Sequence, residues 1–585
     1  METLKIARVL GEMGTLLEVR GENAFRCRAY HNAAQALKGL PSDLSEMIAD
    51  GSLAEVPGIG GTMLAKITQL ATTGHLPSFD DLKKETPPGL IALLRVPGLG
   101  PKKIKVLHDD LKVESLADLR AAAESGRIAP IKGFGPKTEA KILEGVDFLE
   151  SVGDRILQST ARRLIAPILE AVGAMPGVER FEACGSLRRR AETIGDLDIL
   201  FSAEDPVPVL DRFIKLPEVA KVLAHGPTKA SVRLLDGVQC DLRGVGDDQY
   251  PFALHYFTGS KSHNIAMRKR AIGRGLKLSE YGLEGPEGPV PCRTEADLFR
   301  ALGLADIPPE LREDQGEFDL AEAGPLPRLV ERSDLTGTFH CHTDWSDGGA
   351  TLIEMAEAAR AAGLAYLGIA DHSKSAAYAG GLTTDRVRRQ WAEIDALNAA
   401  FGGSFRLFKG TECDILADGS LDFPDELLAG FDYVVASVHS GFGMDREAMT
   451  ARIVRAVRNP FVTMLGHPTG RLLLARDGYA VDLDAVIEAA AESGTMIEIN
   501  ANPHRLDLDA DHARKCKAAG ITIPINPDAH ATGGLADLEY GIGVARRAGL
   551  GPADVFNAGD PSDVAEALAR RRPEAGGKPK RKDGR

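Results

Sequence analysis

The sequence lacks several features that would place it at once in a broad class of protein. None of its apolar runs is long enough to cross a membrane, and its opening residues have the pattern of an amphipathic helix rather than of a signal peptide. Its seven cysteines include no Cys-x-x-Cys pair, which fits a reducing compartment better than a disulfide framework. A basic excess is also missing, because the formal net charge is −14. We therefore expect a cytoplasmic protein without membrane contact, in which any binding to a polyanion depends on local basic patches.

The chain is long enough for several domains. At 585 residues it exceeds what one hydrophobic core supports, so three or more domains are expected. Helical periodicity fills the first third, and strands alternate with helices in the carboxy-terminal half. Between them, residues 308–335 are rich in Pro, Gly and Glu and read as a linker. Lysine and arginine cluster at residues 95–105 and 261–277, despite the overall acidity.

A pair of aspartates lies at the start of a predicted strand. Val178–Cys184 has the pattern of a short strand, Leu187–Glu192 that of one or two helical turns, and Asp196–Phe201 that of a second strand with period two. Because residues two apart on a strand point the same way, Asp196 and Asp198 share one face. Such carboxylates repel each other unless cations lie between them, as in a two-metal site for phosphoryl transfer. A bare Asp-x-Asp is otherwise typical of a solvated strand end or turn.

Further residues suit the same chemistry. The turn at Gly185 and Ser186 presents backbone N–H groups to a triphosphate, and Arg189 has the charge to clamp it. Residues 232–243 have a hairpin pattern with an Asp-Gly turn, which brings a third carboxylate, Asp241, onto a neighbouring strand. These surroundings make the pattern much rarer than Asp-x-Asp alone.

The whole stretch resembles the signature of the nucleotidyltransferase superfamily and, in this full form, that of family X DNA polymerases. The resemblance implies an α+β palm whose catalytic acids Asp196, Asp198 and Asp241 hold two Mg²⁺ or Mn²⁺ ions. It also implies that Asp241 accepts the proton of the primer 3′-hydroxyl. The Gly-Ser turn and Arg189 would then bind a deoxynucleoside triphosphate.

Three similar glycine hairpins recur in the amino-terminal third, at residues 56–60, 96–103 and 131–137. Their glycines permit positive φ and close approach of a sugar–phosphate backbone, and the N–H groups that open the next helix bind a phosphate without sequence preference. The segments resemble helix-hairpin-helix motifs, although one copy alone would read equally well as an ordinary turn between helices. Nonspecific DNA contact is expected at Gly58, Gly60, Gly98, Gly100, Lys102, Gly133 and Gly135.

Residues 25–74 resemble the small lyase-type domain of family X polymerases, and Lys66 falls at the position of its Schiff-base lysine. A catalytic lysine needs a lowered pKa, from burial or neighbouring cations. Here Thr62 replaces the family's supporting lysine, and Arg26 occupies a phosphate-pocket position. The alternative for Lys66 is a lysine that lies on the surface or contacts phosphate.

A Tyr-Phe-Thr-Gly-Ser segment at residues 256–260 resembles the family segment that contacts the deoxyribose and discriminates against a 2′-hydroxyl. Downstream, Asn264 and Arg268 match positions that touch the nucleotide and the template, and they lie one helical turn apart. Lys261 departs from the acidic residue of vertebrate relatives, which leaves the base contact open. The implied nucleotide contacts are Tyr256, Phe257, Gly259, Asn264 and Arg268. The two aromatic residues could instead belong to the core.

The carboxy-terminal half predicts a parallel β/α barrel. Its predicted strands cover residues 338–342, 365–370, 405–412, 433–439, 462–467, 496–500 and 521–528. A polar residue ends nearly every strand, and such barrels place their active sites at that face. His340 and His342 are two apart on one strand, so both imidazoles point into one site, and ligands of this kind suit Zn²⁺ or Mn²⁺ better than Mg²⁺. The same alternation assigns Cys341 and Cys413 to the core.

The order of these ligands resembles the full set of the polymerase and histidinol phosphatase (PHP) domain. The set consists of His340, His342, Asp347, His372, Glu412, His439, His467, Asp528 and His530. By that resemblance Glu412 bridges two ions, one held by His340, His342 and Asp528 and the other by His439 and His467, while Asp347, His372 and His530 hold a third. Such a cluster hydrolyses a phosphate ester. A barrel whose metal site has decayed is the alternative, and Asn500, His504, Arg505 and Arg471 either touch the phosphodiester or cap loops.

The fusion of the two halves resembles the bacterial family X DNA polymerases that carry a PHP domain. It implies gap filling in base excision repair and a Mn²⁺-dependent 3′–5′ exonuclease, with abasic-site endonuclease or 3′-phosphatase as further activities. The expected partners are gapped or nicked duplex DNA and deoxynucleoside triphosphates, for a monomer at the bacterial nucleoid. Three alternatives are a PHP half that hydrolyses pyrophosphate or small esters, a template-independent nucleotidyltransferase, and a catalytically silent DNA-binding scaffold.

The predicted fold is therefore multidomain, with a helical amino-terminal region, an α+β palm and thumb, and a distorted seven-stranded β/α barrel. The predicted domains are a DNA-binding or lyase-type domain (1–80), fingers (81–150), the palm (151–254), the thumb (255–317), a linker (318–335), the PHP domain (336–572) and a basic tail (573–585). The tail is rich in Pro, Gly and basic residues, so disorder and weak DNA affinity are expected there.

Overall fold

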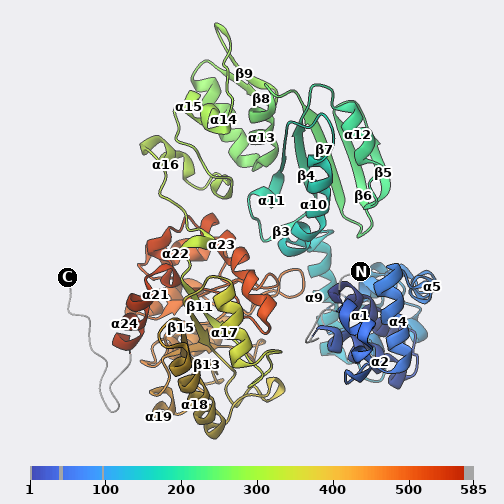
Figure 1. Ribbon diagram of the computed structural model, residues 1–585, viewed down its shortest axis with the longest axis vertical. Helices are drawn as coiled ribbons and strands as arrows, with labels where there is room; N and C mark the ends of the chain where they lie inside the picture. Colours follow the sequence, from blue (N-terminus) through green and yellow to red (C-terminus); the bar gives the residue numbers. More distant parts are fainter. Residues whose placement is uncertain (1–2, 39–43, 95, 97, 572–585) are drawn as a thin grey trace. The chain divides into compact units, whose positions relative to one another are not determined.

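The computed structural model describes residues 3–38, 44–94, 96 and 98–571 and divides into two compact units (Figure 1). The first unit is Met1–Gly153 and the second is Asp154–Arg585. The division falls close to the predicted end of the fingers at residue 150. The predicted basic tail lies outside the described residues. Within the described part of the chain, no helix is long and apolar enough to span a membrane.

The first unit is built from helices. They are α1 (Thr3–Val19), α2 (Ala24–Lys38), α3 (Leu44–Asp50), η1 (Ser52–Glu55), α4 (Gly61–Thr73), α5 (Pro77–Glu85), α6 (Pro88–Leu93), α7 (Pro101–Leu111), α8 (Leu116–Glu124) and α9 (Pro136–Val152). Apolar residues three and four apart bury one face of each helix, as Ile6, Leu10 and Met13 do in α1. One cluster of buried side chains joins α1 to α5, and a second joins α6 to α9.

The second unit begins with the palm. Its elements are β1 (Ile156–Leu157), α10 (Gln158–Gly173), β2 (Arg180–Ala183), α11 (Gly185–Arg188), β3 (Thr193–Ile194), β4 (Leu197–Ser202), α12 (Val207–Phe213), β5 (Val219–His225), β6 (Lys229–Leu234) and β7 (Gln239–Val245). Five strands form a sheet in the order β2-β4-β7-β6-β5, in which only the β4–β7 pair is parallel. The predicted hairpin is confirmed, because β6 and β7 pair antiparallel across the turn at residues 236 and 237.

The thumb follows the palm. It contains α13 (Tyr250–Thr258), α14 (Lys261–Gly273), β8 (Lys277–Ser279), β9 (Gly282–Gly285), β10 (Gly288–Pro289), α15 (Glu295–Ala301), η2 (Pro309–Leu311) and α16 (Glu317–Ala323). The strands β10-β9-β8 form a small antiparallel sheet. A cluster that includes Phe252, Met267 and Phe299 holds the helices together.

The carboxy-terminal part is a curled parallel sheet surrounded by helices. Its strands are β11 (Gly337–Cys341), β12 (Tyr366–Ile369), β13 (Arg406–Asp414), β14 (Tyr433–Ser437), β15 (Met464–Leu465), β16 (Met496–Ile497), β17 (Ile499–Asn500) and β18 (Ile525–Asn526). Strands β11 to β16 pair in chain order, and β17 pairs with β18. A bridge between Cys341 and Ala529 brings the last strand back to the first. The predicted β/α barrel is thus confirmed, with the sixth strand interrupted at Glu498.

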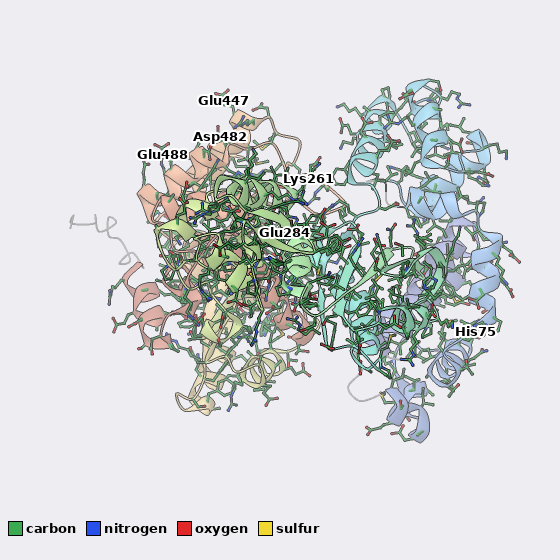
Figure 2. All side chains as sticks on the ribbon, turned by 90° about the horizontal axis from the view of Figure 1, so that it is seen from above. His75, Lys261, Glu284, Glu447, Asp482 and Glu488 are labelled. Atoms are coloured by element: carbon green, nitrogen blue, oxygen red, sulfur yellow. The ribbon has the colours of Figure 1, made fainter. Side chains whose placement is uncertain are left out.

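Amphipathic helices cover the barrel. They are η3 (Arg332–Asp334), α17 (Leu352–Ala361), η4 (Ala377–Ala379), α18 (Thr384–Phe401), α19 (Asp425–Leu428), α20 (Arg446–Val457), α21 (Leu483–Ser493), α22 (Ala510–Ala518), η5 (Thr532–Asp537), α23 (Leu538–Arg547), η6 (Pro552–Asp554), η7 (Phe556–Ala558) and α24 (Pro561–Arg571). On α21, Val486 and Ile487 are buried, whereas Glu488 is exposed on the outer face (Figure 2). Helix α21 therefore packs its apolar side against the barrel.

Two local predictions need correction. The predicted linker is packed rather than free, because α16 lies within it and Val330 and Leu335 are buried in the barrel's hydrophobic cluster. Its high Pro and Gly content masked these apolar anchors. The helical turn predicted over Leu187–Glu192 is α11, which runs from Gly185 to Arg188 and so begins and ends earlier. Gly185, which follows the predicted strand Val178–Cys184, is the first residue of the helix.

Candidate active sites

The acid triad lies at the start of two parallel neighbouring strands. Asp198 on β4 and Asp241 on β7 are register partners, and Asp196 directly precedes β4. Burial raises the pKa of Asp198 to about 7, and repulsion from Asp196 and Asp241 adds to this effect. Asp241 is buried, Asp198 half-buried and Asp196 exposed at the cavity. Divalent cations would neutralise such a group of like charges, so the three carboxylates fit a metal site.

The first residue of α11, Gly185, packs tightly against this triad. Gly185 has a φ of 62°, and a Cβ at that position would lie 2.5 Å from Asp198 Oδ2. Only glycine therefore lets the backbone approach the carboxylate this closely. The predicted Gly-Ser turn is thus fixed by both its backbone conformation and the space available.

Lys229 is a residue of this site that sequence reasoning missed. Its Nζ lies 2.5 Å from Asp241 Oδ2, and Gln239 Nε2 donates to Asp241 Oδ1 at 3.0 Å. A signal was present, because the hairpin register pairs Ser231 with Asp241 and Lys229 lies two residues before Ser231 on the same face. Lys229 offsets part of the triad's negative charge.

A cavity of about 530 Å³ adjoins the triad, large enough for a nucleotide. It brings together Asp196 and Asp198 with all the predicted nucleotide contacts, namely Gly185, Ser186, Arg189, Tyr256, Phe257, Gly259, Asn264 and Arg268. Lys261, on the same wall, is labelled in Figure 2. Asp241 is not among the lining residues. Segments about 60 residues apart in sequence therefore share one pocket.

The aromatic pair lies in the wall of this cavity. The rings of Tyr256 and Phe257 meet edge to face with centroids 5.1 Å apart, and both side chains are half-buried. Arg268 lies over the Tyr256 ring at 5.1 Å. Asn264 Nδ2 donates to the Tyr256 carbonyl at 2.7 Å, and its buried Oδ1 has no hydrogen-bond partner within the described chain. Phe257 also packs against a buried hydrophobic cluster, so it belongs both to the cavity wall and to the edge of the core.

Arg189 is already engaged by the protein. Its Nη1 donates to the Thr258 carbonyl at 2.6 Å, and its Nε lies 3.0 Å from Glu313 Oε1. Glu313 was not identified from the sequence, since it lies 124 residues away with no motif to mark it. A triphosphate would have to compete with this carboxylate for Arg189.

The hairpins of the first unit match the prediction in backbone geometry. The first glycine of each lies in the left-handed region, with φ of 96°, 80° and 92° at Gly58, Gly98 and Gly133. The second glycines cap the helices that follow, α4, α7 and α9, and are Gly60, Gly100 and Gly135. Lys102 is exposed in the first turn of α7. The turns therefore direct helix N-termini outward, as phosphate contact requires.

Lys66 lies on α4 near two uncharged polar groups. Its Nζ is 3.1 Å from Ser78 Oγ and 5.9 Å from the centroid of the Tyr30 ring. Arg26 pairs with Glu22 at 3.2 Å. A cationic neighbour close to Nζ would have favoured a Schiff-base role, so lyase chemistry stays a prediction.

The structure brings all nine predicted PHP ligands to the carboxyl ends of the barrel strands. Glu412 is central, with its carboxylate oxygens 2.8 Å from His467 Nε2, 2.9 Å from His372 Nδ1 and 3.2 Å from His439 Nε2. Four overlapping groups can each hold an ion: His342, Asp347, His372 and His530; His340, His342 and Glu412; His340, His467 and Asp528; and His372, Glu412 and His439. The residues predicted to hold the third ion, Asp347, His372 and His530, form one of these groups together with His342.

Several imidazole nitrogens of this cluster are buried and make no hydrogen bond of good geometry within the described chain. They are His340 Nε2, both nitrogens of His342, His372 Nδ1 and His467 Nδ1. Three of them, His340 Nε2, His342 Nε2 and His372 Nδ1, nevertheless lie 3.2, 3.3 and 2.9 Å from a ligand carboxylate. Buried ring nitrogens that converge with carboxylates in this way fit metal coordination. Burial acts to raise the pKa of Glu412, but the surrounding histidines hold it well below its usual range.

Three of the ligands have strained backbones. His340, His467 and Asp528 have φ of 57°, 24° and 52°, in a region that non-glycine residues rarely occupy. Such strain persists only where surrounding structure enforces it, and it concentrates at functional sites. The backbone at these strand ends therefore adopts the strained conformation that places the ligands.

A second layer of carboxylates orients the imidazoles. Glu498 Oε2 lies 2.8 Å from His340 Nδ1, and Asp414 Oδ1 lies 2.6 Å from His439 Nδ1. Such contacts turn the other ring nitrogen toward a metal. Asp414 had a sequence signal that was not used, because it follows Glu412 by two residues on one strand.

The four residues predicted either to touch the phosphodiester or to cap loops differ in their contacts. Asn500 Nδ2 donates to Asp528 at 3.1 Å, and Arg505 Nε lies 3.6 Å from the same carboxylate, so both adjoin the ligands. Arg471 instead pairs with Glu192 of the palm at 2.6 Å, so it ties the barrel to the palm. His504 is exposed on the same loop.

Comparison with known proteins agrees with a chain that contains a helix-hairpin-helix region, a thumb and a barrel. Family models match residues 1–76 (helix-hairpin-helix domain), 90–147 (SAM-like helix-hairpin-helix tandem), 253–313 (DNA polymerase beta thumb) and 338–502 (PHP domain). DNA polymerase lambda of Rattus norvegicus is 26% identical over 52% of this chain and 54% of its own. A probable phosphatase of Thermoanaerobacter sp. is 30% identical over 29% of this chain and 71% of its own.

One relative extends over nearly the whole sequence. The DNA polymerase/3′-5′ exonuclease PolX of Bacillus subtilis is 38% identical over 574 residues, which cover 97% of this chain and all of that protein. The match therefore covers the parts of this chain that carry the acid triad, the thumb and the barrel. The chain belongs to the family X DNA polymerases that carry a PHP domain.

Proposed function

We propose that the chain is a DNA polymerase that fills short gaps during base excision repair and carries a 3′–5′ exonuclease in its PHP half. The observation that carries the polymerase assignment is the cavity of about 530 Å³, which joins Asp196 and Asp198 to the segment of residues 256–260. Similarity to the Bacillus subtilis protein over nearly the full length supports both activities. The substrates are gapped or nicked duplex DNA and deoxynucleoside triphosphates, and we expect a monomer at the bacterial nucleoid.

In the polymerase half, Asp196, Asp198 and Asp241 would hold two divalent ions, Mg²⁺ or Mn²⁺. These ions supply charge neutralisation for phosphoryl transfer. The N–H groups of the turn at residues 185–186 bind the triphosphate, and Tyr256 and Phe257 form a wall against the deoxyribose. Asp241 accepts the proton of the primer 3′-hydroxyl, and Lys229 offsets its charge before the substrates bind.

The first unit provides the grip on DNA. Helix N-termini after the three glycine hairpins bind backbone phosphates, and Lys102 adds a positive charge beside one of them. Such contacts are independent of base sequence, which suits an enzyme that must act at any gap. Lyase chemistry at Lys66 is a separate hypothesis, tested by borohydride trapping of an abasic-site substrate.

In the PHP half, the nine ligands would hold up to three ions, with Mn²⁺ or Zn²⁺ favoured by the histidine-rich set. Bound ions activate water and neutralise the phosphodiester. Glu498 and Asp414 keep the imidazoles oriented, and Asn500 and Arg505 adjoin Asp528 at the edge of the cluster. Removal of the 3′ nucleotide is the activity that this arrangement supports, with abasic-site endonuclease or 3′-phosphatase as variants of it.

A second candidate for the PHP half is hydrolysis of a small phosphate ester or of pyrophosphate. The similarity to a probable phosphatase over 181 residues favours it. Release of phosphate from a small ester, compared with shortening of labelled DNA under the same conditions, separates the two.

One gel tests both halves. A labelled primer on a single-nucleotide-gapped duplex is incubated with Mn²⁺, with and without deoxynucleotides. Wild type is compared with Asp196→Ala/Asp198→Ala and with His340→Ala/His342→Ala. We expect extension to disappear only in the first variant and shortening only in the second.

Other outcomes discriminate among the alternatives. Extension without shortening would refute the exonuclease and favour the small-ester activity. Extension of single-stranded primers as efficient as of gapped duplexes would favour a template-independent transferase. Binding without either product would leave the scaffold interpretation.

A further inference from the structure

The nucleotide loop, residues 185–190, lines the nucleotide cavity and ends in three consecutive arginines, each of which pairs with a different carboxylate. Arg188 and Arg189 pair with two glutamates of the thumb, and Arg190 pairs with a glutamate of the PHP helix α23. Their partners are Glu295 at 2.7 Å, Glu313 at 3.0 Å and Glu539 at 2.9 Å. The nucleotide loop is thereby connected to both neighbouring parts of the second unit.

Glu313 is shared between the two halves of that unit. Its Oε1 lies 3.0 Å from Arg189 Nε and 3.1 Å from Arg547 Nη1, at the end of α23. Arg547 Nη1 also donates to the Arg189 carbonyl at 3.1 Å. The exposed fractions of the three side chains are 15%, 22% and 20% for Arg189, Glu313 and Arg547. Little solvent screens these charges, so each affects the others strongly.

Helix α23 is held close against this loop. A Cβ on Gly543 would lie 3.3 Å from the Arg190 Cβ, so the helix backbone rests on the arginine side chain. Arg546 of α23 pairs with Glu310 at 2.7 Å, and Arg190 contacts the same carboxylate at 3.2 Å. Arg547 is therefore fixed at its position by the packing of its own helix.

We propose that Arg547 of the PHP half is a positioning residue for nucleotide binding at the polymerase site. The proposal rests on the proposed function, in which Arg189 contacts the triphosphate. When Arg189 turns to the triphosphate it must leave Glu313, and a partly buried carboxylate without a partner is costly. Arg547 keeps Glu313 paired at that moment. Before the triphosphate binds, Arg547 also weakens the ion pair between Glu313 and Arg189, because the two arginines share the Glu313 carboxylate.

The test compares Arg547→Ala with Arg546→Ala. Arg546 is the adjacent residue on α23 and loses a comparable ion pair, but it does not contact Glu313. We expect Arg547→Ala to raise the KM for the incoming deoxynucleotide on a single-nucleotide gap three- to tenfold, with kcat unchanged within twofold. Arg546→Ala leaves KM within twofold, and Arg547→Lys restores most of the wild-type KM because one Nζ can reach both acceptors.

Glu313→Gln provides the second arm. Without the Glu313 charge, Arg189 has no ion pair at this position for Arg547 to weaken. The double variant Glu313→Gln/Arg547→Ala should therefore have the same KM as Glu313→Gln alone. A full additional increase in the double variant would overturn the proposal. So would equal effects of the two arginine variants, or a fall in kcat together with the rise in KM, since both indicate a general structural role.

The proposed function and this coupling fail in different ways. Extension by wild type tests the first. Binding of a fluorescent deoxynucleoside triphosphate, followed by anisotropy with Mg²⁺ and gapped DNA, tests the second without requiring turnover. Equal binding by wild type and Arg547→Ala would refute the coupling, whether or not wild type extends a primer. Retained digestion of single-stranded DNA verifies that Arg547→Ala keeps its fold.

Discussion

At the scale of single residues, Asp198 makes the polymerase half sensitive to pH. Burial, with Asp196 and Asp241 nearby, raises its pKa to about 7, against about 3.9 in an unfolded chain. A raised folded pKa means that the folded state binds the proton more tightly. The tighter proton binding by Asp198 therefore contributes to the free energy of unfolding, and this contribution is fully present below about pH 4 and is lost as the pH rises to about 7. Without divalent ions, the palm loses stability across that window.

Asp198→Asn should abolish this loss. At pH 8 in a chelator, we expect the variant to exceed wild type in free energy of unfolding by about 2 kcal/mol, and at pH 4 the two should coincide. Urea denaturation at the two pH values measures the difference. Asp319→Asn, at an exposed position on α16, serves as the control and should match wild type at both. Equal stability of wild type and Asp198→Asn at pH 8 would contradict the raised pKa.

The candidate sites were predictable where residue type and strand alternation carry the information. Strand alternation places Asp196 beside Asp198 and His340 beside His342, whereas the complete sets of three acids and nine ligands follow from the resemblance to the two families. Glu313 was not predictable in the same way, because it acquires its role only through contacts between segments distant in sequence. Glu498, by contrast, is one of the polar residues expected at the ends of the barrel strands, although the strand is interrupted there.

At the scale of elements, the glycine hairpins combine two different requirements. Gly98 has a φ of 80°, whereas Gly100 has a φ of −85° and caps α7. A Cβ at either position meets open space, with nothing within 4 Å. Gly98 is therefore needed for backbone conformation, and Gly100 only for the close approach of a ligand.

Alanine substitutions separate these requirements. Gly98→Ala should destabilise the first unit by about 1–2 kcal/mol, because an L-residue is strained in the left-handed region. Gly100→Ala should leave stability unchanged within about 0.5 kcal/mol and weaken binding to gapped DNA severalfold, because the methyl group obstructs the phosphate. Thermal unfolding and fluorescence anisotropy measure the two effects. Unchanged DNA affinity of Gly100→Ala would remove this hairpin from the DNA-binding surface.

Element types were largely predictable, and their ends were not. The barrel strands were recognised because each is an apolar run that ends in a polar residue. Strand β15 shrinks to Met464–Leu465, because the chain beyond it already turns to place His467. Ligand geometry overrides strand pairing there, which a pattern of apolar residues cannot indicate.

At the scale of the whole molecule, the two units differ in their dependence on metal. Every proposed ligand lies in Asp154–Arg585, whereas Met1–Gly153 has its own two clusters of buried side chains. Ligand sets that are buried and strained cost stability until ions fill them. Stability of the second unit should therefore depend on divalent ions, and that of the first should not.

Calorimetry with and without metal checks this expectation. Mn²⁺ in excess should raise the Tm of the second unit by 5 °C or more, because binding to the folded state alone adds a few kcal/mol. A fragment of residues 1–153 should unfold at the same temperature in Mn²⁺ and in a chelator. A Tm of the full chain that is insensitive to Mn²⁺ would contradict the metal assignment of the PHP cluster.

The burial of the cysteines also provides a means to follow local unfolding of the chain. All seven are free thiols and buried, and each major part of the chain contains at least one. They are Cys27 in the first unit, Cys184 and Cys240 in the palm, Cys292 in the thumb, and Cys341, Cys413 and Cys516 in the barrel. A buried thiol reacts with an alkylating reagent only when its surroundings open. Pulsed alkylation read by mass spectrometry would therefore report local unfolding part by part, with no substitution in the chain.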